Sequence, residues 1–124
     1  MSLLALDRAL KATGIPTYHF TAVKEDDKYI VWLEEGERSY FRTADTHTMW
    51  ADDHVAQQAI SGVINYVTDE EFDTNVDLLQ KVFYDIGLSY SLSRVEYNEL
   101  LKKVFYQWTF EMPVGDGIYS ESDD

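Results

Sequence analysis

The chain has 124 residues, 45% of them hydrophobic, which suits a single domain with a packed core. It contains no cysteine and no run of about 18 apolar residues, so the sequence excludes disulfides and thiolate metal sites and predicts no membrane-spanning helix. Its 23 acidic and 10 basic residues give a formal net charge of −13, which disfavours nonspecific binding to the phosphates of DNA or RNA.

The N-terminal segment has the spacing of a short amphipathic helix. Leu3, Leu6 and Leu10 would form its apolar side. Ser2 is placed to cap the first turn, and Gly14 favours the end of the helix. We therefore expect one short helix that packs on the rest of the domain through its leucines.

Two β-rich segments follow this helix. Residues 17–23 predict a strand, and residues 29–33 are apolar on both faces, as in a strand in the middle of a sheet. Residues 34–37 favour a hairpin turn, and the chain would return through residues 39–43.

A further strand and a second helix are predicted in the central part of the chain. Residues 57–67 predict the strand, with Gly62 as a bulge or a point of close approach. Thr68 and Glu71 match a capping box, so a helix is expected from residue 70 to Gly87. Its apolar stripe would consist of Phe72, Val76, Leu79, Phe83 and Ile86.

The C-terminal part predicts one clear strand. Residues 88–93 fit a short strand or an extended connection, and residues 95–103 fit a helical turn that passes into a strand. Residues 104–112 alternate cleanly, with one face formed by Val104, Tyr106, Trp108, Phe110 and Met112. The predicted fold is α+β: a mainly antiparallel or mixed sheet, with the N-terminal helix and one central helix packed on one face. Residues 1–113 form this domain, and residues 114–124 are expected to be a flexible acidic tail.

One group of residues has side chains that could bind a divalent metal. This group comprises Asp45, His47, Asp52, Asp53 and His54, in the irregular stretch after residue 43. The spacing matches neither a His-Glu-x-x-His motif nor a calcium loop. No nucleophile motif or phosphate-binding loop occurs elsewhere, so we expect no metal, no cofactor and no enzymatic activity.

The arm from residue 37 to residue 56, which includes this stretch, carries apolar side chains among polar neighbours. Tyr40, Phe41, Met49 and Trp50 are the candidate site residues of the chain, because aromatic and Met side chains in such loops often form protein interfaces. The alternative is that these side chains fold back and cover the sheet.

The order of the segments resembles a phage family. The relevant segments are Thr-Gly-Ile-Pro at 13–16, Thr-Tyr-His-Phe at 17–20, Tyr-Ile-Val-Trp at 29–32, Ala-Asp-Thr at 44–46, Val-Ile-Asn-Tyr-Val-Thr at 63–68 with the acid-capped helix after it, and Phe-Tyr-Gln-Trp-Thr-Phe at 105–110. Together they are similar to the small tail-terminator or tail-completion proteins encoded in the head–tail joining region of long-tailed phages and prophages of Gram-positive bacteria. The likeness spans most of residues 3–112 and lies in patterned segments rather than in a signature motif.

The resemblance implies a non-enzymatic virion protein, assembled in the cytoplasm of a bacterial host. Its relatives form a six-membered ring that caps the tail tube at its final length and provides the surface to which the filled head docks. The implied partners are other copies of the chain, the major tail tube protein and a head-completion protein. Carboxylates around the bore of such a ring would repel phosphates, so that DNA passes without specific binding. A neighbouring head–tail joining protein of similar size would fit the same pattern.

Two other functions remain open at this point. The first is an acidic DNA mimic that inhibits a basic nucleic-acid-binding protein, using the acids predicted on the central helix: Asp69, Glu70, Glu71, Asp73, Asp77 and Asp85. The second is a small enzyme with the loop at residues 45–54 as its site. The acidic charge could also serve only to keep the protein dissolved.

Overall fold

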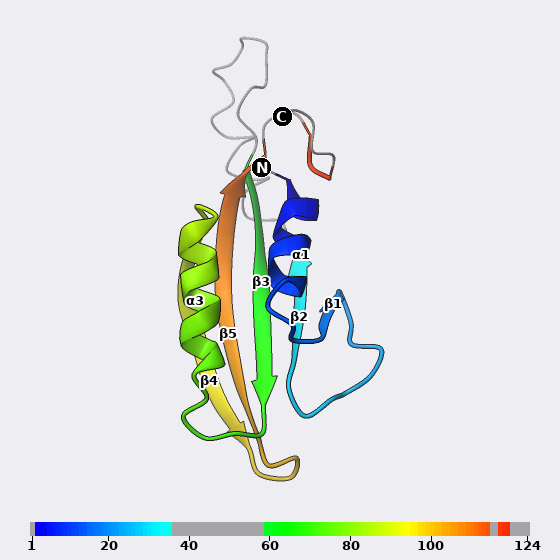
Figure 1. Cartoon of the computed structure of the whole chain (residues 1–124), viewed down its shortest axis with the longest axis vertical. Helices are drawn as coiled ribbons and strands as arrows, with labels where there is room; N and C mark the ends of the chain where they lie inside the picture. Colours follow the sequence, from blue (N-terminus) through cyan, green and yellow to red (C-terminus); the bar gives the residue numbers. More distant parts are fainter. Residues whose placement is uncertain (1, 36–58, 115–116, 120–124) are drawn as a thin grey trace.

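The fold of residues 2–35, 59–114 and 117–119 is described by a computed structural model (Figure 1). The elements are α1 (Leu3–Lys11), β1 (Thr17–His19), β2 (Tyr29–Glu34), β3 (Ala59–Thr68), α3 (Asn75–Asp85), β4 (Ser89–Asn98) and β5 (Lys103–Pro113). They form one five-stranded sheet and two helices, which confirms the predicted α+β class. In the described parts of the chain, no helix is long and apolar enough to cross a membrane.

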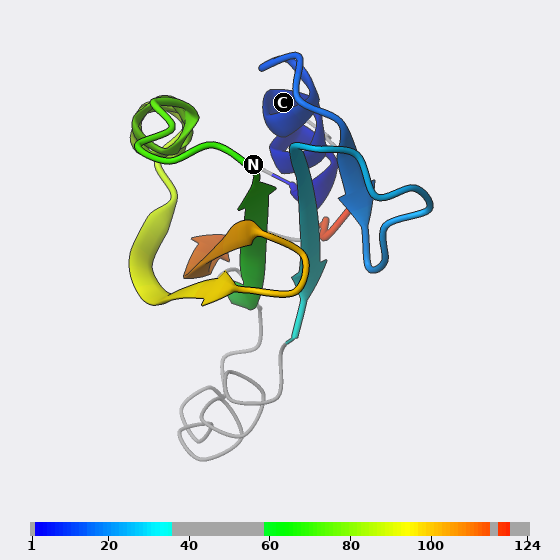
Figure 2. The ribbon, with the colours of Figure 1, turned by 90° about the horizontal axis from the view of Figure 1, so that it is seen from below.

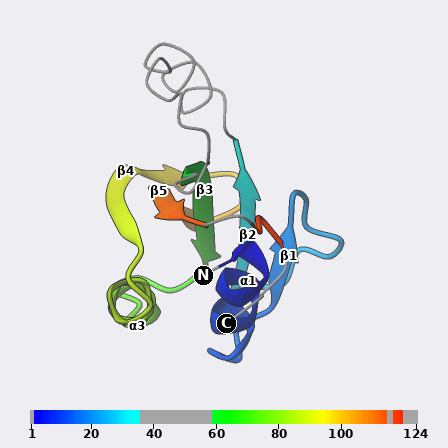
Figure 3. The ribbon, with the colours of Figure 1, turned by 90° about the horizontal axis from the view of Figure 1, so that it is seen from above.

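The strand order across the sheet is β1-β2-β3-β5-β4. The pair of β1 and β2 is parallel, and the other three pairs are antiparallel, so the sheet is mixed. The prediction that β2 lies inside the sheet is confirmed, because β1 and β3 flank it. Figures 2 and 3 view the molecule from its two ends and place both helices on the same face of the sheet.

The core lies between the helices and this face. Leu3, Leu6 and Leu10 of α1 are fully buried, and the Ser2 hydroxyl caps the helix by accepting the Ala5 amide at 3.3 Å. The second helix contributes two buried side chains, Leu79 and Phe83. The Phe83 ring stands edge-on to Trp108 of β5, with 5.2 Å between the ring centroids. The sheet contributes Ile30, Trp32, Ile64, Tyr66, Trp108, Phe110 and Met112.

The helix α3 begins later than predicted. It starts at Asn75 rather than at residue 70, and the predicted capping box does not form. The Thr68 hydroxyl accepts the Glu70 amide at 3.1 Å, but it donates its proton to Asp73 at 2.6 Å. The Asp73 carboxylate in turn accepts the Asn75 amide at 2.8 Å. Asp73 therefore replaces Glu71 as the acid that organises the start of the helix.

Phe72 does not belong to the apolar stripe of this helix, so that part of the prediction is wrong. Its backbone φ is 55°, in the left-handed region, and its side chain is 86% exposed. The remaining four members of the stripe do face the core: Val76, Leu79, Phe83 and Ile86.

Turns shorten or end several predicted strands. The first strand ends at His19 rather than at residue 23, because Phe20 has a φ of 74° and the Thr21 amide folds back to the His19 carbonyl at 2.9 Å. The ambiguous stretch 95–103 is strand as far as Asn98, followed by a turn in which Lys102 has a φ of 58°. No helical segment occurs there.

Gly62 is a point of close approach rather than a bulge. A Cβ atom at this position would clash with the Leu33 carbonyl oxygen and would lie 2.7 Å from the Phe110 ring. The register on both sides of Gly62 is regular. The irregularity in the sheet falls instead between Leu92 and Arg94 of β4.

Packing continues beyond Pro113, where the domain was predicted to end. Val114 is 4% exposed, and Ile118 packs against the core. The Leu3 amide donates to the Ile118 carbonyl at 2.9 Å, and the Tyr119 hydroxyl donates to Glu34. In its described residues, the segment predicted to be a flexible tail is thus attached to α1 and β2.

Candidate interaction surface

The four predicted site residues, Tyr40, Phe41, Met49 and Trp50, lie outside the described residues. The same holds for the predicted turn and return strand at residues 34–43 beyond Glu35, and for the acids and histidines at residues 45–54. Within the described ranges there is no group of three or more His, Cys, Asp or Glu side chains that could hold a metal ion.

The most exposed apolar side chains of the sheet lie on β4. Leu92, Val95 and Tyr97 are 46%, 53% and 58% exposed. They pair with Trp108, Tyr106 and Val104 of β5, so they share the face that the helices cover elsewhere. The helix α3 covers only the start of this strand, where the Phe83 ring meets Tyr90 with 5.2 Å between centroids. Neither α1 nor α3, the two helices of the described residues, covers the rest of the strand on this face.

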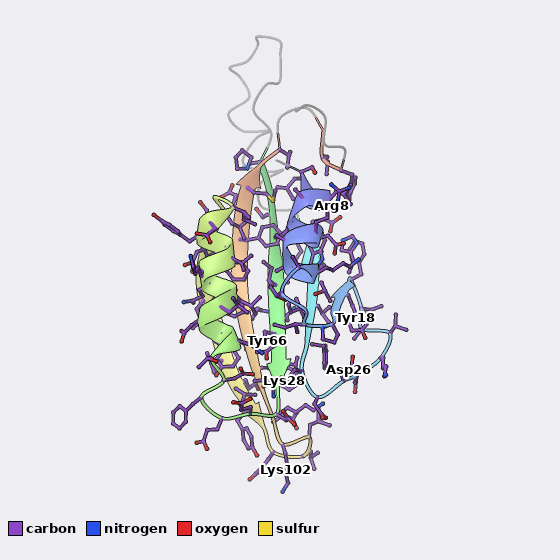
Figure 4. All side chains as sticks on the ribbon, viewed as in Figure 1. Arg8, Tyr18, Asp26, Lys28, Tyr66 and Lys102 are labelled. Atoms are coloured by element: carbon purple, nitrogen blue, oxygen red, sulfur yellow. The ribbon has the colours of Figure 1, made fainter. Side chains whose placement is uncertain are left out.

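The turn after β4 extends this apolar surface. Leu100 and Leu101 are 92% and 53% exposed. The turn is held by Asn98, whose side-chain oxygen accepts the Leu101 amide at 2.9 Å and whose carbonyl accepts the Lys102 amide at 2.7 Å. Figure 4 shows Lys102 at the tip of this hairpin, at one end of the molecule. We call the five residues Leu92, Val95, Tyr97, Leu100 and Leu101 the β4 surface.

A hollow adjoins the β4 surface. It has a volume of about 490 Å³ and lies between the β3–α3 loop and the hairpin, lined by Asp69, Glu71, Tyr97, Lys102 and Val104. Its walls combine the side chains of Tyr97 and Val104 with two carboxylates and one ammonium group.

On the opposite face of the sheet, a line of hydrogen bonds made by polar side chains crosses four strands. The Gln107 side chain donates to Asn65 at 3.0 Å, and Asn65 donates to the Val31 carbonyl at 3.3 Å. The Ser93 hydroxyl donates to the Gln107 carbonyl at 3.1 Å. These bonds satisfy the polar groups on this face and hold its strands together.

A second cavity of about 500 Å³ lies at one end of the sheet. Its polar lining consists of hydroxyls and two carboxylates, from Ser61, Ser89, Ser91, Thr109, Glu35 and Glu111. It contains no histidine, lysine or arginine among its described lining residues. The lining combines hydroxyls and carboxylates, groups that donate and accept hydrogen bonds.

His19 belongs to a cluster of side chains that joins three segments of the chain. Its ring is stacked between Phe20 and Trp32, at centroid distances of 4.1 and 4.2 Å. Its Nε2 atom lies 2.6 Å from a Glu34 oxygen, and the other Glu34 oxygen accepts the Tyr119 hydroxyl. Burial opposes ionisation of Glu34, but the bonds from Tyr119 and His19 outweigh it and hold the pKa of Glu34 below its usual range. The group joins β1, β2 and the C-terminal segment.

The most buried acid of the described chain is also structural. Asp73 is 6% exposed and accepts the hydroxyls of Tyr66 and Thr68 at 2.7 and 2.6 Å. Burial raises the pKa of Asp73, but these bonds and the Asn75 amide more than offset it, so the pKa lies below its usual range. Burial and the carboxylate raise the pKa of Tyr66 to about 12. Asn75 completes the group by donating to the Tyr66 oxygen at 3.0 Å.

Comparison of the chain with protein-family models, with curated proteins and with solved structures returned no match. The candidate site therefore rests on the geometry of this chain alone. Sequence reasoning missed the β4 surface because it did not show how far α3 reaches along the sheet. One signal was present: Leu100 and Leu101 stand together between Glu99 and Lys102 in a segment that turns.

Proposed function

We propose that the chain is a structural subunit of a phage tail, of the tail-terminator or head–tail joining type. In this role copies of the chain form a ring on the end of the tail tube and present the surface on which the head docks. The observation that carries the proposal is the β4 surface: three exposed apolar side chains on β4 and two in the turn after it. The element order expected from the resemblance and the acidic composition support the same role.

The β4 surface has the energetics of a binding site. Full burial of a Val, Leu or Phe-sized side chain contributes about 1.5–3 kcal/mol relative to exposure. These five side chains are 46% to 92% exposed, so their burial on a partner would contribute several kcal/mol before the entropy of association is counted. Exposed apolar side chains contribute little to the stability of the fold. Their presence together at the surface therefore favours a role in assembly.

The surroundings of the carboxylates favour the ring subunit over the DNA-mimic alternative. Lys28 binds both Asp69 and Glu70, at 3.0 and 3.1 Å. Lys81 binds Asp85 at 3.2 Å, and Asp73 is buried. Of the six acids on which mimicry would depend, only Glu71 and Asp77 have neither burial nor a recorded ion pair in the described structure. Mimicry needs many free carboxylates on one face, whereas repulsion of passing DNA needs only net negative charge around a bore.

Electron microscopy of tail tubes tests the proposal. Tubes of the phage or prophage that encodes the chain should carry the protein at one end, and tubes assembled without it should vary in length. Leu100→Asp and Leu101→Asp should abolish this binding. Leu4→Asp is the matched control, because Leu4 is 40% exposed on α1, away from the β4 surface. Normal binding by the Leu100 and Leu101 variants would refute the role of this surface, and absence of the wild-type protein from tubes would refute the function.

A pull-down from host lysate addresses the alternative function. Recovery of a basic nucleic-acid-binding enzyme that DNA displaces would favour the DNA mimic. Recovery of the tube protein, with binding that DNA leaves unchanged, would favour the tail subunit.

A further inference from the structure

The second half of β4 is exposed on three sides. This strand is an edge of the sheet, and every residue from Ser91 to Asn98 is exposed. Among the described strands only β5 pairs with it. The other edge, β1, is 3 residues long, against 10 for β4. An exposed edge of this length presents unpaired backbone amides and carbonyls to which another strand can bind.

The charges on this strand are self-complementary. Arg94 and Glu96 both point to the face away from the helices, opposite Gln107 and Phe105 of β5. Their Nε and Oε1 atoms are 3.5 Å apart, and their side chains are 63% and 62% exposed. If a second β4 pairs antiparallel about Val95, each Arg94 lies opposite Glu96 of the other copy. Opposite charges in directly facing positions stabilise a strand pair.

Other registers are unfavourable for the same residues. Moving the centre of the pair to residue 94 places two arginines opposite each other, and moving it to residue 96 does the same with two glutamates. A shift of one residue between the strands turns the apolar side chains of one copy to the polar face of the other. The register centred on Val95 keeps Leu92, Val95 and Tyr97 of both copies on one side.

We propose that two copies of the chain bind each other through their β4 strands, antiparallel and centred on Val95. The pairing would join two five-stranded sheets into one continuous sheet. The irregularity between Leu92 and Arg94 limits the regular pairing to the second half of the strand, so the dimer should be weak and concentration-dependent. A two-fold interface uses the same surface on both copies and is closed. It therefore cannot itself build a ring, and free dimers would have to separate before a ring forms through this surface.

Sedimentation analysis of the full chain tests this pairing. The wild type should shift from monomer to dimer as its concentration rises. Arg94→Glu and Glu96→Arg should each weaken the dimer by about tenfold or more, because like charges then face each other twice. The double variant Arg94→Glu/Glu96→Arg should dimerise like the wild type. A mixture of the two single variants should form a heterodimer, since one chain then carries two glutamates and the other two arginines.

Two matched control variants separate the effect of net charge from the effect of strand pairing. Lys102→Glu and Glu99→Arg make the same changes in charge in the turn outside the proposed pair, and should leave the dimer unchanged. All four positions are exposed, so circular dichroism should show an unchanged fold. The inference would be overturned if the wild type stayed monomeric at every attainable concentration. It would also be overturned if the single charge reversals left the dimer unchanged, or if the two single variants failed to associate when mixed. These outcomes do not depend on tail tubes, so the proposed tail function can fail or hold separately.

Discussion

The region of α1, β2 and β3 and the strand β4 are stabilised in different ways. In the first region, side chains join segments far apart in sequence: Trp32 donates to Asp7 at 2.9 Å, and Lys28 binds Asp69 at 3.0 Å. The strand β4 depends mainly on its backbone pairing with β5, and most of its side chains are exposed. The difference indicates that side-chain packing contributes more to the stability of the first region than to that of β4. Substitutions can therefore test each region with little effect on the other.

The largest expected contrast is between two leucines. Leu79→Ala removes a fully buried side chain of α3 and should lower the free energy of unfolding by about 2–5 kcal/mol. Leu92→Ala makes the same change on β4, where the side chain is 46% exposed, and should lower it by less than about 1 kcal/mol. Urea denaturation measures both. Equal losses would show that β4 belongs to the stabilised core.

A smaller effect is expected at the buried carboxylate. Asp73→Asn weakens the bonds from Tyr66 and Thr68 and should destabilise the fold by about 2–3 kcal/mol, since bonds to charged groups are each worth about 1.5–3 kcal/mol. Glu71→Gln, an exposed acid in the same loop, is the control and should change stability by less than about 0.5 kcal/mol.

The way in which the free energy of unfolding changes with pH should depend on the Asp73 carboxylate. Because the pKa of folded Asp73 lies below its usual value, its contribution is complete above the unfolded pKa of about 3.9 and is lost as the pH falls through the folded pKa. The free energy of unfolding should thus fall below about pH 4, and less steeply in Asp73→Asn. An identical slope in wild type and variant would mean that Asp73 does not contribute. Glu71→Gln should keep the wild-type slope.

The smallest effect is expected at the ion pairs between the β1–β2 and β3–α3 loops. Lys28→Met removes the bonds to Asp69 and Glu70, which are partly exposed, so the loss should be smaller than for Asp73→Asn. The difference from wild type should shrink further in 1 M salt, where the Debye length is about 3 Å. A loss that high salt leaves unchanged would point to lost packing of the Lys28 chain instead.

Most of the fold could be predicted because its signals are local. The leucine spacing of α1 and the alternation in β5 depend on the period of the element alone, and both were confirmed. The predicted start of α3 was wrong. Thr68 and Glu71 satisfy the local rule for a capping box, but the Asp73 carboxylate gains an additional partner from Tyr66 in the preceding strand. Such a bond depends on how the loop after the strand turns, which the spacing of the residues does not show.

The candidate site was less predictable than the fold. Sequence patterns showed which face of a strand is apolar, but not whether a helix covers it. Val95 and Trp108 are both apolar residues on the helix-side face of the sheet, yet one is 53% exposed and the other fully buried. The difference depends on the position of α3, which is a property of the assembled fold. The predicted interface at Tyr40, Phe41, Met49 and Trp50 stays a prediction.

The hydrogen bonds of Asp73 with Tyr66, Thr68 and Asn75, which form the Asp73 cluster, also affect how the chain folds. Its bonds join residues that are only two, five and seven positions apart, so closing them requires the ordering of a short loop. The sheet and the contact between Leu3 and Ile118, in contrast, need distant parts of the chain to meet. The end of β3 and the start of α3 can therefore organise early, as a local unit on which slower long-range pairing builds. If so, loss of the Asp73 carboxylate will slow folding rather than only accelerate unfolding.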